Sequence, residues 1–351
     1  MIRVWAPDAG AVDLVVGEAR VPMKGPDEAG WWEASFAVPA GSRYGFSVDG
    51  GPVRPDPRSP SQPEGVHGRS EAVDHGAFPW TDGGWQAPPL EQAVVYELHV
   101  GTFSEAGTFA GVIDGLDHLV GLGVTHVELM PVAEFPGRWG WGYDGVHLYA
   151  PHHGYGGPAG LKALVDACHA RGLAVLLDVV YNHLGPAGNY LGTFGPYFTD
   201  RYATPWGQAV NLDGRDSDEV RAFLVENSRM WLRDYHLDGL RLDAVHAILD
   251  TSAVHLLEEL AAGLLPGRVL IAESDLNDPR VVGRPEEGGY GVDAQWSDDF
   301  HHALHALLTG ERAGYYADFG STAALGKALR QAFVYDGVYS PHRRQIGRAH
   351  V

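Results

Sequence analysis

Beyond residue 93, short apolar runs alternate with segments whose apolar residues recur at the spacing of a helix. Parallel strands need a long crossover, which is usually a helix, so this alternation predicts a parallel α/β fold. The strand-like runs lie at residues 94–100, 124–130, 173–180, 238–243, 269–272 and 292–296. Helices are expected at about 109–121, 158–171 and 252–262, and from 217 onward. A closed (β/α)8 TIM barrel has eight strands, so we expect a barrel truncated after about the sixth.

Two of the predicted helices have recognisable ends. Pro158 lies in the first turn of one helix and Gly172 follows its last residue, as is typical of helix termini. Asp216 precedes the other helix, and Glu219 follows three residues later in a capping-box pattern. We therefore expect the side chain of Asp216 to cap the helix that begins at residue 217.

The first 85 residues have a different pattern. Short alternating runs at 2–5, 12–16, 31–36 and 44–48 are separated by turns rich in glycine and proline. Such spacing is typical of a β-sandwich. The pairs Gly83-Gly84 and Pro88-Pro89 mark a boundary. We predict a β-sandwich domain over residues 1–85 and an incomplete catalytic (β/α) barrel over residues 86–351.

Charge and composition limit the possible ligands. The formal net charge of −20 over 351 residues argues against nucleic acid or an anionic membrane as a partner. Ten Trp and fifteen Tyr would suit a neutral, hydroxyl-rich ligand, because aromatic faces stack on sugar rings, although aromatic residues more often lie in the core. The single cysteine, Cys168, excludes an internal disulfide and is expected to be buried in a helix. The chain shows no signal segment and no long apolar run, which predicts a cytoplasmic protein.

Polar residues gather at the ends of three predicted strands. One run ends with Asp178 and continues to Asn182 and His183, and the stretch 238–246 places Arg241 and Asp243 on one face of a strand. Burying such a charged pair is costly, and catalytic residues of parallel barrels lie at the C-terminal ends of strands. A surface ion pair at a strand end is the alternative interpretation.

A second carboxylate, Glu273, ends the next strand-like run. Asp243 and Glu273 at neighbouring strand ends would supply the two carboxylates that glycoside hydrolysis requires. A separation of roughly 5–5.5 Å would predict retention of configuration through a covalent intermediate. Arg241 would keep Asp243 ionised and nucleophilic, and the apolar run before Glu273 would suit a general acid.

These three strand ends resemble the first three signature regions of the alpha-amylase superfamily of glycoside hydrolases, and the resemblance covers about residues 93–300. It implies that Asp243 is the nucleophile and Glu273 the acid/base. It also implies that Arg241 and His183 bind the reacting sugar, and that Tyr143 stacks under that sugar. The substrate would be an α-glucan, and no metal or cofactor would be needed.

Further residues match family positions less directly. Asp178 and Asn182 correspond to largely structural positions, and we include Asn182 among the substrate-binding residues. The stretches 96–103, 130–137, 272–279 and 295–305 resemble the trehalose-releasing members of the superfamily. These members hydrolyse the α-1,4-glucosidic bond next to the terminal trehalose of a maltooligosyltrehalose. His246 and Ala247 stand where common amylases have lysine and histidine. This difference predicts that the part of the site that binds the sugar acceptor is narrowed and that His246 helps to form it.

Two other functions remain open. Residues 4–7 resemble the early-set, immunoglobulin-like domain that precedes branching, debranching and trehalose-releasing members alike. A 1,4-α-glucan branching or debranching enzyme is therefore the second hypothesis. An inactive glucan-binding fragment is the third.

Weaker signals have simpler interpretations. His301, His302 and His305 include a pair at helical spacing that could suggest zinc, but no His-Glu-x-x-His pattern is present, so we expect structural or substrate-side histidines. The glycine-rich run 154–157 lacks the lysine and hydroxyl residue of a phosphate-binding loop and predicts a turn that leads into a helix. Trp139 and Trp141 could line a sugar cleft or pack in the core.

The chain departs from the superfamily near its C-terminal end. The fourth signature, a His-Asp pair at the seventh strand that supplies a third carboxylate, does not follow Glu273, and Asp298 and Asp299 come too early to replace it. Residues 345–351 match the translation of a common sequencing-adapter sequence. We therefore expect a truncated reading frame with an adapter-derived tail. Such a chain would expose unpaired strand edges and would be unstable and inactive by itself.

Overall fold

The computed structural model describes residues 2–346. Its internal contacts divide the chain into two units. Unit 1 consists of Met1–Leu240 with Gly263–Val269, and unit 2 consists of Arg241–Ala262 with Leu270–Val351. No helix within residues 2–346 has the length and apolar character that a membrane crossing requires.

The N-terminal part of unit 1 forms two antiparallel sheets, and all four predicted strands are present. The strands are β1 (Arg3–Trp5) paired with β4 (Trp31–Glu33), and β3 (Ala19–Pro22), β2 (Val12–Val16), β5 (Arg43–Val48) and β6 (Ser70–Glu71) in that order. Val12 and Leu14 of β2 are buried while Asp13 between them is partly exposed, as the alternating pattern requires. β4 ends at Glu33, three residues before the predicted end.

Aromatic contacts join these sheets to later segments of unit 1. The ring of Trp5 meets Tyr197 edge-on at 5.2 Å between centroids, and Phe46 meets Phe194 at 6.2 Å. All four side chains are buried. Aromatic pairs in this geometry contribute about 0.5–1.5 kcal/mol beyond the area they bury, so the N-terminal sheets are firmly attached within unit 1.

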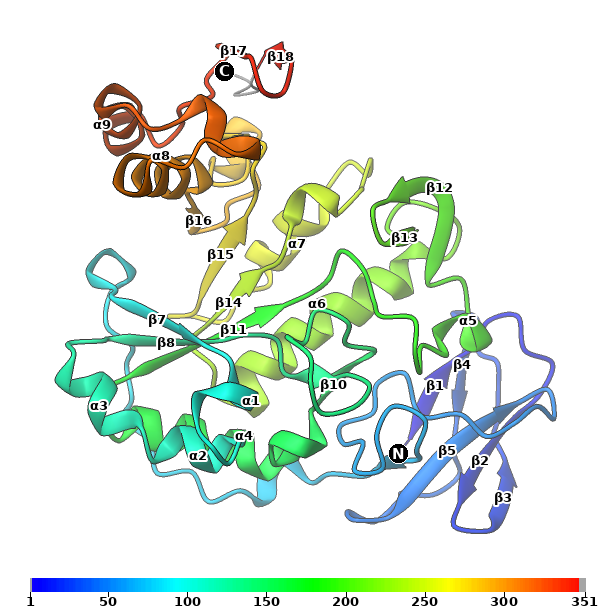
Figure 1. Ribbon diagram of the computed structural model, residues 1–351. Coiled ribbons are helices and arrows are strands. Elements are labelled where there is room, and N and C mark those ends of the chain that lie inside the picture. The colour runs from blue at the N-terminus through cyan, green and yellow to red at the C-terminus, as the bar shows by residue number, and fades with distance from the viewer. Residues whose placement is uncertain (1, 347–351) are drawn as a thin grey trace. The chain divides into compact units, whose positions relative to one another are not determined.

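A parallel sheet forms the centre of unit 1. β7 (Val95–Leu98), β8 (His126–Leu129) and β11 (Ala174–Val179) are neighbours in parallel register (Figure 1). The beginnings of β14 (Gly239–Leu242) and β15 (Val269–Glu273) continue the same pattern. The amide of Asp238 donates to the carbonyl oxygen of Val175 at 2.8 Å, and the amide of Val269 donates to the carbonyl oxygen of Asp238 at 3.1 Å.

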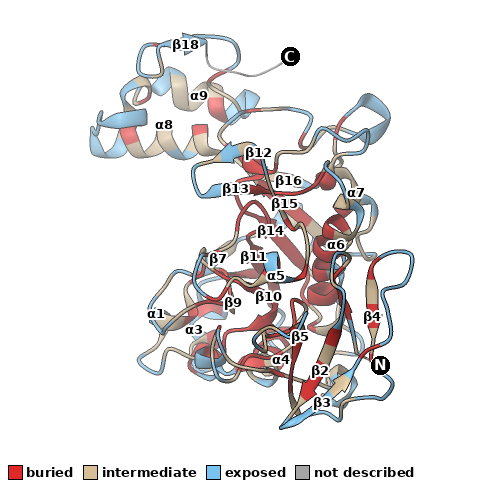
Figure 2. Ribbon diagram, turned by 90° about the vertical axis from the view of Figure 1, so that its right-hand side faces the viewer, coloured by how far each residue is buried: buried red, intermediate tan, exposed pale blue. Residues whose placement is uncertain are grey.

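Helices follow these strands as the alternation predicts. They are α1 (Val100–Phe103), α2 (Phe109–Ile113), α3 (Leu116–Gly121), α4 (Gly157–His169), α5 (Leu191–Phe194) and α6 (Ser217–Asp234). Two hairpins complete the unit: β9 (Ala133–Glu134) with β10 (His147–Pro151), and β12 (Phe198–Thr204) with β13 (Gly207–Val210). α4 packs against β10 and β11, and β11 is buried along its whole length (Figure 2).

Three expectations about these helices can be compared with the structure. The helix expected at 109–121 is broken, because α2 ends at Ile113 and α3 begins at Leu116. The prediction for Asp216 is wrong: its side chain caps no amide, since the residue has φ 59° and its carboxylate lies 3.0 Å from Arg215 Nε. Cys168 is buried in α4 as predicted, and burial raises the pKa of its thiol to about 12.

Unit 2 combines short strands with helices. Within it β15 pairs in parallel with β16 (Ala294–Trp296), with Ile271 opposite Ala294. The helices are α7 (Leu256–Ala262), α8 (Asp298–Thr309) and α9 (Thr322–Gln331), and β17 (Tyr339–Ser340) pairs with β18 (Gln345–Ile346). Of the proposed adapter-derived tail, 345–351, only the first two residues form β18, and 347–351 lie outside the described residues.

A buried carboxylate organises the beginning of β14. Asp238 is 1% exposed and accepts hydrogen bonds from His169 Nε2 at 2.9 Å, Trp85 Nε1 at 2.9 Å and the amide of Val175 at 2.8 Å. Arg268 Nη1 donates a fourth at 3.0 Å. A buried charge is tolerated only when its partners are complete, and here four donors surround one carboxylate.

We predict that Asp238→Ala lowers the free energy of unfolding by about 3–5 kcal/mol, because it leaves several buried hydrogen-bond donors and the charge of Arg268 without a partner. Urea denaturation followed by tryptophan fluorescence measures this loss. The control is Asp117→Ala, whose side chain is 86% exposed and pairs with Arg171 at the surface, where less than about 1 kcal/mol is expected. Equal losses in both variants would contradict the structural role of Asp238.

Candidate active site

Three of the predicted site residues, Tyr143, Asn182 and His183, lie together in unit 1 with Asp178, for which a structural role was expected. Asp178 is near the end of β11, and its Oδ2 accepts a hydrogen bond from the hydroxyl of Tyr143 at 2.8 Å. His183, five residues further on, places Nε2 2.8 Å from the carbonyl oxygen of Tyr143. The side chain of Asn182 contacts Nδ1 of the same imidazole. These contacts therefore join the end of β11 to the loop before β10.

A cavity of about 430 Å³ opens beside Tyr143 and His183. Trp141 and Trp206 complete its aromatic lining, and the Trp206 ring stacks on His183 at 4.5 Å with an interplanar angle of 7°. The volume lies within the usual range of small-ligand pockets. Flat aromatic walls with a few polar groups between them are suited to a sugar ring, whose faces are apolar and whose rim carries hydroxyls.

The exposed fractions of Trp139 and Trp141 show whether these side chains pack in the core. Trp139 is 81% exposed and Trp141 is 71% exposed, so neither packs in the core. Trp141 borders the larger cavity, and Trp139 borders a separate cavity of about 60 Å³. Of these two exposed tryptophans, Trp141 is therefore the one placed to contact a ligand in the larger cavity.

Trp206 lines the larger cavity and was not among the residues predicted from the sequence. It lies in the tight connection between β12 and β13, next to Pro205 and Gly207, and is 48% exposed. The signal available in the sequence was an aromatic residue between two turn-forming residues, where it cannot be buried by its own strands. Its position over His183 depends on the hairpin, which spacing alone does not reveal.

The two predicted catalytic carboxylates lie in unit 2 with the predicted arginine. Arg241 and Asp243, at the end of β14, are only 7% and 8% exposed, so the alternative of a surface ion pair is wrong. Arg241 Nη1 lies 2.8 Å from Asp243 Oδ1, and Nη2 lies 3.1 Å from Glu273 Oε1. The amide of Ala244 donates to Glu273 Oε2 at 2.8 Å. One guanidinium thus holds both carboxylates at adjacent strand ends.

Further ionisable groups of unit 2 lie close by. His246 Nδ1 is 4.0 Å from Asp275 Oδ1, and the His246 side chain borders a cavity of about 150 Å³. Asp298 begins α8, where burial raises the pKa of its carboxyl and the nearby carboxylates of Glu273 and Asp275 raise it further. This concentration of carboxylates is typical of a site that handles protons.

Asp299 has a structural environment. Its Oδ2 accepts hydrogen bonds from the amides of Val334 and Tyr335, at 2.6 and 2.9 Å, and from Asn277 Nδ2 at 2.8 Å. Because three donors occupy this oxygen, Asp299 joins α8 to the segment that follows α9. This agrees with the interpretation that Asp299 does not replace the third catalytic carboxylate.

The histidines of α8 do not form a metal site within residues 2–346. His305 Nε2 pairs with Glu311 at 2.8 Å, and its ring stacks on Tyr316. Burial, with a further contribution from His301, lowers the pKa of His302 to about 4. These contacts favour the predicted structural role.

Comparison with known proteins adds an independent line of evidence. Residues 80–194 match the sequence model of the alpha-amylase catalytic domain. A Mycobacterium tuberculosis protein named malto-oligosyltrehalose trehalohydrolase is 54% identical over 359 residues, which cover 99% of this chain and 62% of that protein. A 1,4-alpha-glucan branching enzyme from Corynebacterium jeikeium is 32% identical, over 85% of this chain and 48% of that enzyme.

A solved structure shows the same fold. It comes from Salmonella typhimurium, from a protein provisionally described as an alpha amylase, and superposes with a TM-score of 0.91 at 42% identity. The match covers 98% of this chain and 60% of the other. The chain therefore spans about 60% of the length of the Mycobacterium tuberculosis and Salmonella typhimurium proteins. The predicted resemblance to trehalose-releasing members is confirmed.

Proposed function

Because this chain has an alpha-amylase-type fold with a parallel half-barrel sheet and is homologous over nearly its whole length to malto-oligosyltrehalose trehalohydrolases, we propose that it is the catalytic part of a trehalose-releasing glycoside hydrolase. The proposed reaction is hydrolysis of the α-1,4-glucosidic bond next to the terminal trehalose of a maltooligosyltrehalose, with retention of configuration. The observation that carries the proposal is the pair of carboxylates, buried Asp243 and partly buried Glu273, held by the one guanidinium of Arg241.

The proposed mechanism has two steps. Asp243 attacks C1 of the glucosyl residue while Glu273 gives its proton to the leaving oxygen, which breaks the C1–O bond and frees trehalose. Glu273 then removes a proton from water, whose oxygen attacks C1 and releases the oligosaccharide from Asp243. Arg241 supports both steps, since it stabilises the charge on Asp243 before attack and after its release.

Substrate-binding roles are assigned within each unit separately. In unit 1, Tyr143 and Trp206 supply aromatic faces and His183 supplies a polar edge to the cavity. Asn182, which is buried against the His183 imidazole, is assigned to substrate binding through its contact with that ring. In unit 2, His246 borders a cavity and is assigned to the acceptor side.

The domain assignment is also part of the proposal. Residues 1–85 are assigned to an early-set β-sandwich, supported by the two antiparallel sheets, and residues 86–351 to the catalytic barrel. The proposal also includes a cytoplasmic location and a function in trehalose biosynthesis.

A branching or debranching enzyme is the second candidate, and the 32% identity to a branching enzyme favours considering it. Product analysis separates the two. The chain is incubated with maltooligosyltrehalose, with a linear maltooligosaccharide and with amylose, beside a chimera completed with the remaining segment of the Mycobacterium tuberculosis relative. We expect free trehalose from the first substrate in the chimera. New branch points in amylose, with no trehalose, would move the assignment to a branching enzyme.

We predict that Trp206→Ala weakens binding of a maltooligosaccharide by about 2- to 13-fold, which corresponds to the 0.5–1.5 kcal/mol of one aromatic stacking contact. Isothermal titration calorimetry measures this in the chain itself and needs no turnover. The control is Trp139→Ala, which removes an exposed tryptophan that does not line the larger cavity. Unchanged binding in the Trp206 variant would remove Trp206 from the site.

A further inference from the structure

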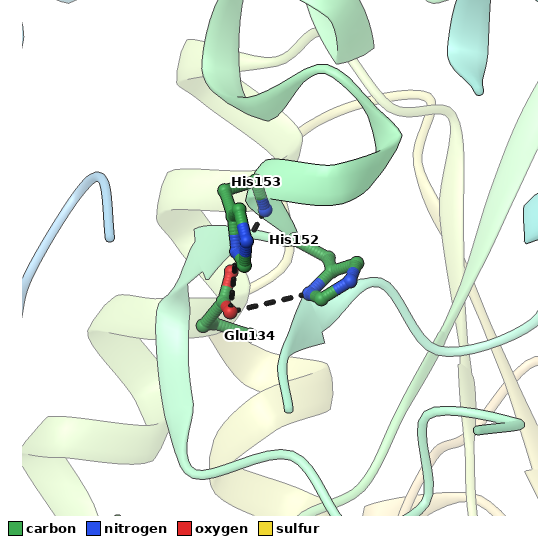
Figure 3. A group of neighbouring side chains, drawn as sticks. All are labelled: Glu134, His152 and His153. Carbon is green, nitrogen blue, oxygen red and sulfur yellow. Dashed lines mark hydrogen bonds and ion pairs between the residues drawn. The ribbon is translucent and has the colours of Figure 1, made fainter. Parts of the chain in front are cut away.

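Three potential metal ligands lie together in unit 1, and none of them is assigned to catalysis. Glu134 comes from β9, and His152 and His153 follow the end of β10 (Figure 3). Glu134 Oε1 lies 2.8 Å from His153 Nδ1 and 3.2 Å from His152 Nδ1. All three ligand atoms lie within 4.8 Å of one another. The paired hairpin strands bring these side chains to one point.

One member of the cluster, His152, is buried in a way that demands a partner, and it lies beside the buried carboxylate of Glu134. Glu134 and His152 are both 0% exposed. Among the described residues, Nε2 of His152 has no hydrogen-bond partner, and Nδ1 makes only the 3.2 Å ion-pair contact with Glu134 Oε1, which lacks hydrogen-bond geometry. The His152 ring is fixed between Phe135, stacked at 4.0 Å, and Tyr155, edge-on at 4.8 Å. A buried carboxylate beside an unsatisfied imidazole is costly unless a positive charge joins them.

The distances suit a small cation. Two ligands bound about 2.0–2.2 Å from one zinc ion at the tetrahedral angle are roughly 3.4 Å apart. The separations of 2.8 and 3.2 Å from Glu134 Oε1 fall slightly below this value, so a small outward shift would admit an ion. The amide of His153 donates to Glu134 Oε2 at 2.8 Å, which orients the carboxylate and leaves Oε1 facing the imidazoles.

We propose that Glu134, His152 and His153 bind one divalent transition-metal ion of the zinc class. Two imidazoles and one carboxylate are ligands that Zn²⁺ prefers, whereas Ca²⁺ and Mg²⁺ need several oxygen ligands. Water completes the coordination. The cavity of about 60 Å³ beside His152 has room for about two water molecules, and the His153 side chain is 37% exposed.

The place of this site in the chain indicates its role. Glu134 directly precedes, and His152 closely follows, a segment that contains Trp139, Trp141 and Tyr143. An ion held by both ends would fix the base of this loop and so steady the aromatic residues it carries. The ion positions the loop and takes no part in the chemistry assigned to Asp243 and Glu273.

The test uses the untagged chain, stripped with a chelator and dialysed. Competition titration with a chromophoric chelator measures Zn²⁺ binding, and Co²⁺ substitution reports the ligand geometry through its visible absorption. We expect one equivalent of Zn²⁺ per chain, an intense tetrahedral Co²⁺ spectrum, and a rise in Tm with Zn²⁺ that Ca²⁺ and Mg²⁺ do not produce. His153→Ala should weaken Zn²⁺ binding by at least about tenfold and abolish the Co²⁺ spectrum.

Two further variants make the test decisive. His118→Ala removes an exposed histidine elsewhere in unit 1 and should leave Zn²⁺ binding unchanged. Glu134→Gln keeps the shape of the buried side chain, so its loss of binding can be measured in a protein whose circular dichroism shows it folded. The absence of stoichiometric binding in the unmodified chain overturns the proposal. So does equal affinity in the His153→Ala and His118→Ala proteins, since the ion would then bind at adventitious surface groups.

Discussion

Asp243→Asn is expected to reduce trehalose release by on the order of 10⁴-fold or more, because the amide cannot form the covalent glycosyl intermediate. The substitution keeps the size of the side chain and an oxygen that can accept from Arg241, which lies 2.8 Å from Asp243. The fold and the arginine should therefore persist while the chemistry is lost. Trehalose is measured by chromatography in the chimera described above.

The matched control for this variant is Asp117→Asn, whose side chain lies at the surface far from β14 in sequence and is not part of the site. It should leave the rate unchanged. Titration of Asp243→Asn with maltooligosaccharide should still give binding, since the aromatic cavity of unit 1 is untouched. Substantial turnover by the Asp243 variant would mean that another group is the nucleophile.

Glu273→Gln is expected to lower kcat by about 10²–10⁴-fold, the usual contribution of a general acid. The reason is that glutamine cannot protonate the leaving oxygen. Fluoride leaves without needing a proton. The rate of the first step should therefore fall much less with an α-maltosyl fluoride than with maltooligosyltrehalose. Rates with the two substrates are compared by fluoride release and trehalose release.

This comparison distinguishes a catalytic role from a structural one. Glu273 accepts a hydrogen bond from the amide of Ala244 and pairs with Arg241. If these contacts were its only role, replacing Glu273 would lower the rates with both substrates equally. Equal losses with both substrates would contradict the assignment of Glu273 as the acid. Glu259→Gln, on α7, serves as the control substitution of the same kind.

The parallel strands were predictable because their burial leaves long apolar runs. β11 is buried at every position, and its run in the sequence is continuous. Element boundaries were less accurate for physical reasons. The helix expected at 109–121 breaks at Asp114 and Gly115, and α7 begins at Leu256 rather than near residue 252. Tertiary contacts decide such ends, and local pattern does not contain them.

The candidate site was predictable where it follows strand ends. Asp178, Arg241 and Glu273 come directly from strands, so their approximate positions follow from the fold. Their roles, and those of Asp243, His183, Asn182, Tyr143 and His246, stay predictions.

Groups that a hairpin assembles were not predictable from spacing. Trp206 reaches His183 only because β12 and β13 turn back on each other, and Glu134 meets His152 across the β9–β10 pair. Asp216 shows the opposite case: a capping pattern was present, but the residue has a left-handed backbone and its side chain pairs with Arg215 instead.

One measurement tests the central claim most directly: time-resolved proton NMR of maltooligosyltrehalose hydrolysis by the chain and by the completed chimera. It observes trehalose and the configuration of the new reducing end together. If Asp243 is the nucleophile and Glu273 the acid/base, the configuration at C1 is retained. Trehalose and the α-anomer of the shortened oligosaccharide then form first, and the β-anomer follows only by mutarotation. Early formation of the β-anomer would contradict the nucleophile mechanism, and glucan products without trehalose would contradict the proposed function.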